Sequence, residues 1–200
     1  MKTENYNEQQ KLLSKEGKHI IAHFDEKTIT VYQAFRKETA EFAAANQKFG
    51  GNFYSFTRMT WIKPNFMWMM YRSGWALKPG QERILAIKLK REGFDEIVNQ
   101  AVHSSFQPDI YANRETWQEA VQNLEVRLQW DPDHDPAGEK LTRKAIQLGL
   151  RGEVLQKFNN DWIVEIEDIT SFVAEQREFA KRDFEGLVVP VERVYSLLKN

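Results

Sequence analysis

Cysteine is absent from the 200-residue sequence, which excludes disulfide bonds, thiolate nucleophiles and zinc sites with cysteine ligands. No apolar run approaches the ~18 residues that a membrane-spanning helix needs. The first 18 residues also lack the apolar core of a signal peptide. We therefore expect a cytoplasmic protein with no membrane partner.

The sequence also lacks an excess of charge of either sign, because its formal net charge is −1. A protein that coats nucleic acid through bulk electrostatics would be strongly basic. With 42% hydrophobic and 28% charged residues, the composition is typical of a globular protein, and the length suits one domain.

Several catalytic and metal-binding motifs are missing. The absence of GxGxxG, of a Walker loop and of a Ser-His-Asp order disfavours hydride transfer on a Rossmann fold and P-loop phosphoryl transfer. The stretch DPDHDP, residues 131–136, lacks the glycine and the glutamate of a calcium loop. We expect a rigid turn there and no metal.

Residue patterns predict the order of the elements. Alternation and β-branched residues predict strands over residues 19–24, 29–35, 53–63, 82–90, 126–130, 144–150 and 162–169. Helical spacing and capping residues predict helices over residues 36–49, 64–74, 93–102, 113–124, 152–160, 172–184 and 190–200. The first two strands should form a hairpin. This irregular mixture favours an α+β class: a single domain over residues 19–200, with a mixed or antiparallel twisted sheet flanked by helices, after a polar N-terminal arm over residues 1–18.

Residues 57–75 combine three of the six Trp and four of the five Met with no acid. The cations of this segment are Arg58, Lys63 and Arg72. Trp61 on the expected strand, and Trp68 and Tyr71 on the following helix, can form an aromatic wall beside these cations. Aromatic faces stack on bases or nicotinamide, and cations match phosphate. The alternative is simple core packing, since Met in particular fills gaps.

Two carboxylates follow one another on the last expected strand, in WIVEIEDIT. Alternation places Glu165 and Glu167 on one face with Ile163, about 7 Å apart. The other face, with Trp162, Val164 and Ile166, should meet the core. Such a carboxylate pair can bind sugar hydroxyls and stabilise an oxocarbenium-like centre. The alternative is a solvent-facing strand edge.

A polar pair, Tyr32-Gln33, lies near the end of a strand that leads directly into a helix. Alternation places the two side chains on opposite faces, so one of them should face a cavity or solvent. The alternative is a tyrosine hydroxyl satisfied at the edge of the core.

The chain resembles a family catalogued as domain of unknown function 4291. The segments that carry the resemblance are TVYQAF, RMTWIKPNFMWMMYRSGW, KPGQERILAI, RLQWDPDHD and WIVEIEDIT. They span roughly residues 19–170, and the family name implies no activity.

The order of elements is also similar, more weakly, to that of ADP-ribosyltransferases. This resemblance implies that Tyr32-Gln33 stand at the first signature of that fold, Tyr71 at its aromatic position, and Glu167, preceded by Glu165, at its catalytic E-x-E. It implies NAD as substrate and a nucleic acid or protein as acceptor.

Three hypotheses follow. In the first, the protein is a transferase in which Glu167 stabilises the ribosyl cation, and NAD is held by Arg58, Trp61, Lys63, Tyr71 and Arg72. In the second, the same groove binds a nucleotide or single-stranded nucleic acid without catalysis. In the third, the aromatic segment is only core, and a partner surface lies elsewhere.

Overall fold

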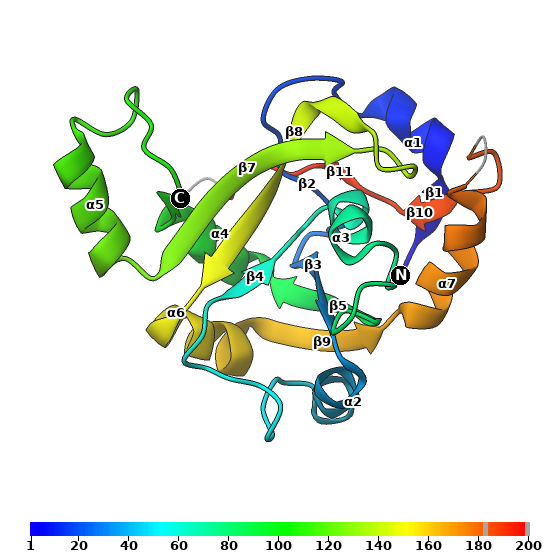
Figure 1. The fold of residues 1–200 in the computed structure, drawn as a ribbon, viewed down its shortest axis with the longest axis horizontal. Coiled ribbons are helices and arrows are strands. Elements are labelled where there is room, and N and C mark those ends of the chain that lie inside the picture. The colour runs from blue at the N-terminus through cyan, green and yellow to red at the C-terminus, as the bar shows by residue number, and fades with distance from the viewer. Residues whose placement is uncertain (182–183, 199–200) are drawn as a thin grey trace.

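The computed structural model describes residues 1–181 and 184–198 and has the expected α+β class (Figure 1). Its helices are α1 (Tyr6–Leu12), α2 (Lys37–Asn46), α3 (Phe66–Ser73), α4 (Arg91–Asn99), α5 (Arg114–Asn123), α6 (Gly152–Lys157), the π-helix η1 (Phe158–Trp162) and α7 (Thr170–Phe179). Its strands are β1 (Thr3–Asn5), β2 (Ile21–Ala22), β3 (Thr28–Phe35), β4 (Thr60–Ile62), β5 (Arg83–Lys90), β6 (Val102–His103), β7 (Val126–His134), β8 (Lys140–Leu150), β9 (Ile163–Asp168), β10 (Val188–Pro190) and β11 (Arg193–Val194).

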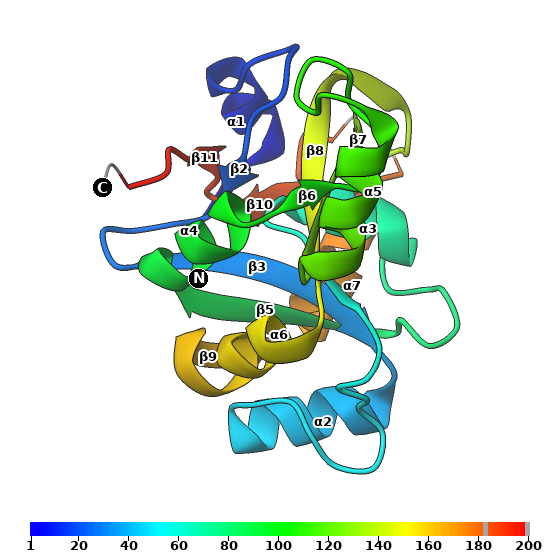
Figure 2. The same cartoon turned by 90° about the vertical axis from the view of Figure 1, so that its left-hand side faces the viewer.

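Two sheets form the centre of the molecule. One is antiparallel with the order β3-β5-β9, and the other has the order β4-β8-β7-β6, in which only β6 runs parallel to its neighbour. The strands of the two sheets run across one another in Figure 2. Tyr32 of β3 and Lys63, just after β4, connect the sheets through two backbone hydrogen bonds of 2.7 and 3.2 Å.

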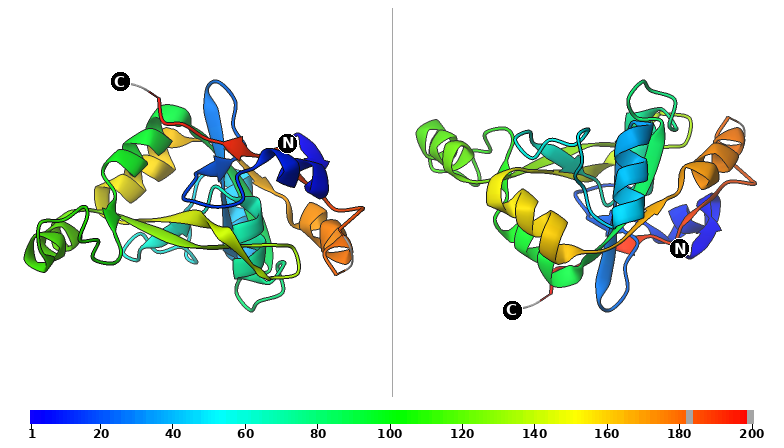
Figure 3. Two further views of the ribbon diagram at one scale, coloured as in Figure 1. Left: turned by 90° about the horizontal axis from the view of Figure 1, so that it is seen from above. Right: turned by 90° about the horizontal axis from the view of Figure 1, so that it is seen from below.

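Each face of β3 meets a different apolar core, as strand alternation requires. Val31 and Ile87 contribute to the larger core, which also contains the inner faces of β4, β7 and β8. Tyr32 points the other way, into a second core that it shares with Phe66 of α3 and Val173 of α7. The helix α5 has no buried residue and lies at one end of the molecule (Figure 3).

Helix α3 is fixed at its start by a buried carboxylate. The Asn65 side chain caps the helix by accepting a 2.7 Å hydrogen bond from the Trp68 backbone N–H. The Glu192 carboxylate accepts from the Phe66 N–H at 2.7 Å and from the Asn65 amide at 3.3 Å. The first N–H groups of a helix have no partner within the helix. These acceptors therefore satisfy N–H groups that would otherwise be buried without a hydrogen bond. Glu192 thereby sets where the side chains of α3 lie.

The predictions fail mainly where two strands that are far apart in the sequence pair with one another. The helix expected over residues 190–200 is wrong, because Arg193–Val194 instead pairs with Ile21–Ala22. The expected hairpin is reduced to a turn with one bridge between Phe24 and Ile29, since the first strand pairs with β11. Positions 182–183 and 199–200, at the ends of two expected helices, lie outside the described residues.

Two further expectations need correction. The rigid turn expected at DPDHDP is wrong for its first four residues, because β7 continues to His134 and the turn follows at Asp135–Glu139. On β9, Val164 was expected in the core but is 49% exposed. The pairing of β5 with β9 shifts at Lys88/Leu89, and this irregularity breaks the alternation on which the expectation rested.

The segment expected as a polar arm packs against the end of the chain. Its strand β1 pairs with β10, and the buried Gln9 amide donates to the Pro190 carbonyl at 2.7 Å. The described residues contain no helix that is both long and apolar enough to cross a membrane.

Replacing Glu192 should destabilise the fold in a pH-dependent way. Burial raises the pKa of Glu192 well above its ordinary value, so the folded chain holds a proton that the unfolded chain releases. Wild-type stability should therefore fall as pH rises above about 4.5. Glu192→Gln, which keeps an acceptor for the Phe66 N–H, should flatten this fall in urea unfolding between pH 5 and 8.

The alanine variant measures what the hydrogen bond from the Phe66 N–H contributes to stability, apart from the effect of the Glu192 proton. Glu192→Ala leaves the buried Phe66 N–H without an acceptor and should lower the free energy of unfolding by roughly 1–3 kcal/mol. Glu8→Ala, at an exposed position, should change the free energy of unfolding little. Equal stability of the Glu192→Ala variant and the wild type would contradict the anchoring role.

Candidate functional site

A hollow of about 360 Å³ lies on the outer face of the four-stranded sheet, beside α3. We call it the Lys63 pocket, and its lining residues are Trp61, Lys63, Trp68, Arg72, Gln129, Asp131 and Gln147. Strand alternation explains why the lining is polar and aromatic. The residues that alternate with the lining residues on the strands, such as Ile62 and Leu148, point into the core. Gln147 and Gln129 are directly paired across β8 and β7, which brings their side chains together.

Lys63 is the central cation of this pocket. The side chain is buried, and its Nζ has one hydrogen bond, to the Trp61 carbonyl at 3.5 Å. Burial and, to a smaller extent, the neighbouring Arg72 lower the pKa of Lys63 to about 8, and Asp131 partly opposes them. Among the described residues, no carboxylate forms an ion pair with either Lys63 or Arg72. The pocket therefore has two cations available to an anionic ligand.

Two amides and a carboxylate line the opposite wall. The Gln129 Nε2 donates to Asp131 Oδ1 and the Gln147 Nε2 donates to Asp131 Oδ2, both at 2.8 Å. Since each amide uses an N–H group on Asp131, the orientation of both glutamines is fixed. Each glutamine retains its carbonyl oxygen as a hydrogen-bond acceptor.

The aromatic side chains of α3 form a stack that extends away from the pocket. Tyr71 lies against His134 with 3.4 Å between ring centroids, and Trp68 stacks on both at 5.5 Å. Among the described residues, the Trp68 Nε1–H is buried and has no hydrogen-bond partner, and the same is true of both ring nitrogens of His134. These atoms have no exposed surface, so they belong to the packed stack and not to the open part of the pocket.

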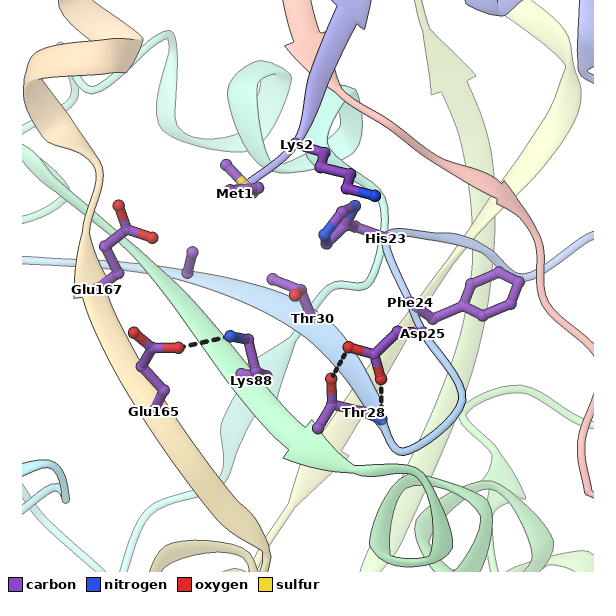
Figure 4. A pocket seen from close by; sticks show the side chains of 11 residues that line it. Met1, Lys2, His23, Phe24, Asp25, Thr28, Thr30, Lys88, Glu165 and Glu167 are labelled. Carbon is purple, nitrogen blue, oxygen red and sulfur yellow. Dashed lines mark hydrogen bonds and ion pairs between the residues drawn. The ribbon is translucent and has the colours of Figure 1, made fainter.

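The two glutamates of β9 lie in a different hollow. This Glu167 pocket has a volume of about 580 Å³ (Figure 4). Its lining residues are Met1, Lys2, His23, Phe24, Asp25, Thr28, Thr30, Ala86, Lys88, Glu165 and Glu167. Glu165 forms an ion pair with Lys88 at 2.5 Å, which lowers the pKa of Glu165. The Glu167 carboxylate has no hydrogen bond or ion pair within the described part of the chain.

The expected single hollow is therefore divided in two. Trp61, Lys63 and Arg72 line the Lys63 pocket, Glu165 and Glu167 line the Glu167 pocket, and the two linings share no residue. The expectation that cations, aromatic rings and a late carboxylate converge on one cavity is wrong.

The remaining predicted site residues line neither hollow. Tyr32 is fully buried, with its hydroxyl 3.7 Å from the Met1 sulfur. Gln33 is also buried and donates to the Thr60 hydroxyl at 2.6 Å and to the Trp61 carbonyl at 3.2 Å, so it supports β4 from behind the Lys63 pocket. Tyr71 belongs to the stack with His134, and Arg58 is exposed on the loop before β4.

A model of the family described as domain of unknown function (DUF4291) matches residues 19–195. The chain belongs to the DUF4291 family. The match lends no support to the resemblance to ADP-ribosyltransferases. No curated protein matches the sequence.

Three lining residues of this DUF4291 chain, Gln129, Asp131 and Gln147, were not expected at a site. Gln129 and Asp131 alternate within RLQWDPDHD, and this alternation was the available signal. The local pattern of this segment predicts only a strand followed by a turn. Across the described residues, no group of three or more His, Asp or Glu side chains is arranged to hold a metal ion.

Replacing Lys63 with an apolar residue should stabilise this DUF4291 chain. Lowering a lysine pKa from 10.5 to about 8 corresponds to about 3 kcal/mol of unfavourable free energy. Lys63→Met should therefore raise the free energy of unfolding at pH 7 by up to about 3 kcal/mol. The gain should shrink between pH 8 and 10.5, where the folded wild type already carries a neutral amine.

The control is Lys48→Met, because Lys48 is exposed and the same chemical change should leave stability within about 0.5 kcal/mol. Denaturant unfolding at pH 7 and pH 10 measures both variants. Destabilisation by Lys63→Met would make Lys63 a structural residue.

Proposed function

We propose that the Lys63 pocket binds a nucleotide, either free or at an exposed position of a single-stranded nucleic acid, without catalysis by Glu167. The observation that carries this proposal is the set of polar groups that the fold leaves unused there. Within the described part of the chain, Lys63 and Arg72 have no ion-pair partner. The buried Lys63 ammonium is costly without an anionic partner, and Arg72 is exposed and so available to the same ligand.

Each part of a nucleotide has a matching group in the pocket. Lys63 and Arg72 suit the phosphate, for which guanidinium and ammonium groups are the usual partners. Trp61 is half-buried and can stack on a base, whereas the Trp68 ring is already covered by Tyr71 and His134. The size of the hollow, about 360 Å³, suits a mononucleotide better than a whole dinucleotide.

ADP-ribosyl transfer from NAD is the competing hypothesis. It requires a carboxylate beside the bond that breaks, and therefore one hollow shared by the dinucleotide and Glu167. The linings of the two pockets have no residue in common. This separation favours binding over transfer.

Nucleotide binding should depend on Trp61 and Arg72 but not on Glu167. Binding affinity is measured by titrating the purified protein with AMP, GMP and NAD at low salt and recording tryptophan fluorescence or heat. Trp61→Ala and Arg72→Ala should each weaken binding at least about tenfold, since stacking and charge-assisted contacts contribute roughly 1–3 kcal/mol each. Affinity should fall with salt because phosphate contacts are electrostatic.

Two variants serve as controls. Arg58→Ala removes an exposed cation that lines neither pocket and should leave binding unchanged. Glu167→Gln should also bind normally. NAD consumption that disappears in Glu167→Gln would restore the transferase hypothesis, and wild-type binding in Trp61→Ala would remove the Lys63 pocket as the site.

The fixed glutamines also favour one kind of base. Each amide donates one N–H to Asp131 and keeps one, so the acceptors of the pocket wall, which are the carbonyl oxygens of Gln129 and Gln147 and the remaining lone pairs of Asp131, outnumber its two free N–H donors. Guanine carries adjacent N1–H and N2–H₂ donors, whereas adenine offers one donor beside an acceptor. An acceptor-rich wall therefore suits guanine.

GMP should accordingly bind about tenfold or more tightly than AMP, since a good two-point base contact discriminates by roughly 1–3 kcal/mol. IMP, which lacks the 2-amino group, should fall between them. Asp131→Asn frees the glutamines to turn and should bring the GMP to AMP ratio close to one, whereas the exposed Asp109→Asn should preserve it. Equal affinities of the wild type for the three nucleotides would contradict guanine selection but not nucleotide binding.

A further inference from the structure

Lys63 is the only buried lysine among the described residues. Its amine supports the fold through a single 3.5 Å hydrogen bond to a neighbouring carbonyl and has no ion pair within the described chain. A buried ammonium with so few partners is unfavourable for stability. Because Lys63 lines a hollow open to ligands, the amine is placed where it can react.

The surroundings of Lys63 favour the neutral, nucleophilic form of the amine. Burial and the Arg72 guanidinium lower the pKa of Lys63 to about 8. At pH 7 roughly a tenth of the amine is then unprotonated, about 300-fold more than for an ordinary lysine. Desolvation beside another cation is a known way to activate a lysine nucleophile.

We propose that Lys63 forms an imine with a small carbonyl compound that carries an anionic group. This activity goes beyond nucleotide binding and rests on the pocket alone. Arg72 is the partner for the anionic group, Trp61 offers a flat surface, and the volume of about 360 Å³ limits the ligand to a small molecule.

The reaction balances without an oxidant or reductant. The Nζ lone pair of the neutral amine attacks the carbonyl carbon and a C–N bond forms as the C=O π bond breaks; the nitrogen releases one proton and the oxygen takes one, which gives a carbinolamine. The hydroxyl then takes a proton and leaves as water while the nitrogen releases its second proton, which gives the imine. Asp131, the carboxylate of the pocket, is the group that can carry these protons.

Reductive trapping tests the proposal. The probe is pyridoxal 5′-phosphate, a flat aldehyde with a phosphate, at a concentration below that of the protein at pH 7, followed by borohydride and peptide mass mapping. We expect labelling at Lys63 at least tenfold above that at the exposed Lys48 and Lys27. The labelling rate at Lys63 should reach half its maximum near pH 8.

Variants and a second probe separate reactivity from binding. Lys63→Arg keeps a positive charge but removes the amine, so it should abolish the adduct. Arg72→Gln, or pyridoxal without its phosphate, should lower the labelling of Lys63 at least about fivefold. Thermal melting of Lys63→Arg shows whether the variant is folded.

The outcomes are distinguishable. Labelling spread evenly over surface lysines, or total labelling unchanged in a folded Lys63→Arg, would overturn the proposal. An adduct at Lys63 without any nucleotide binding would contradict only the proposed function.

Discussion

Two backbone hydrogen bonds between Tyr32 and Lys63 connect the two sheets on which the rest of the molecule is built. At this junction the polypeptide places a fully buried tyrosine on one side and a buried lysine on the other. The strands of the two sheets cross at this junction (Figure 2). The face of β3 that carries Tyr32 continues toward Glu167 and its pocket. Lys63, which directly follows β4, faces the other pocket, beside α3. The separation of the two pockets is a consequence of this junction.

The Lys63 pocket also depends on the anchoring of α3. Glu192 and Asn65 satisfy the start of the helix. At its other end Gly74 adopts a left-handed conformation, with φ of 57°, and donates to the carbonyls of Met70 and Tyr71. A short helix fixed at both ends holds Trp68 and Arg72 against the sheet with little freedom, and this preorganisation favours ligand binding.

The polar groups of the Lys63 pocket differ in how completely the fold satisfies them. Asp133 and Arg143, on β7 and β8 outside the pocket lining, satisfy one another in a buried ion pair of 2.6 Å. Lys63 and Arg72, by contrast, have no ion-pair partner within the described chain. Two cations without a carboxylate partner in one hollow are the feature on which the proposed binding of an anion depends.

The sequence by itself determined the α+β class, most helices and strands of the central region, and the proximity of Trp61 to the cations Lys63 and Arg72. These features follow from local periodicity and capping, which act over a few residues. Only the tertiary structure decided that β2 pairs with β11, that Gln129 and Gln147 meet beside Asp131, and that Glu167 lies in another hollow. Such pairings join residues far apart along the chain, and no local pattern specifies which strand edge will satisfy another.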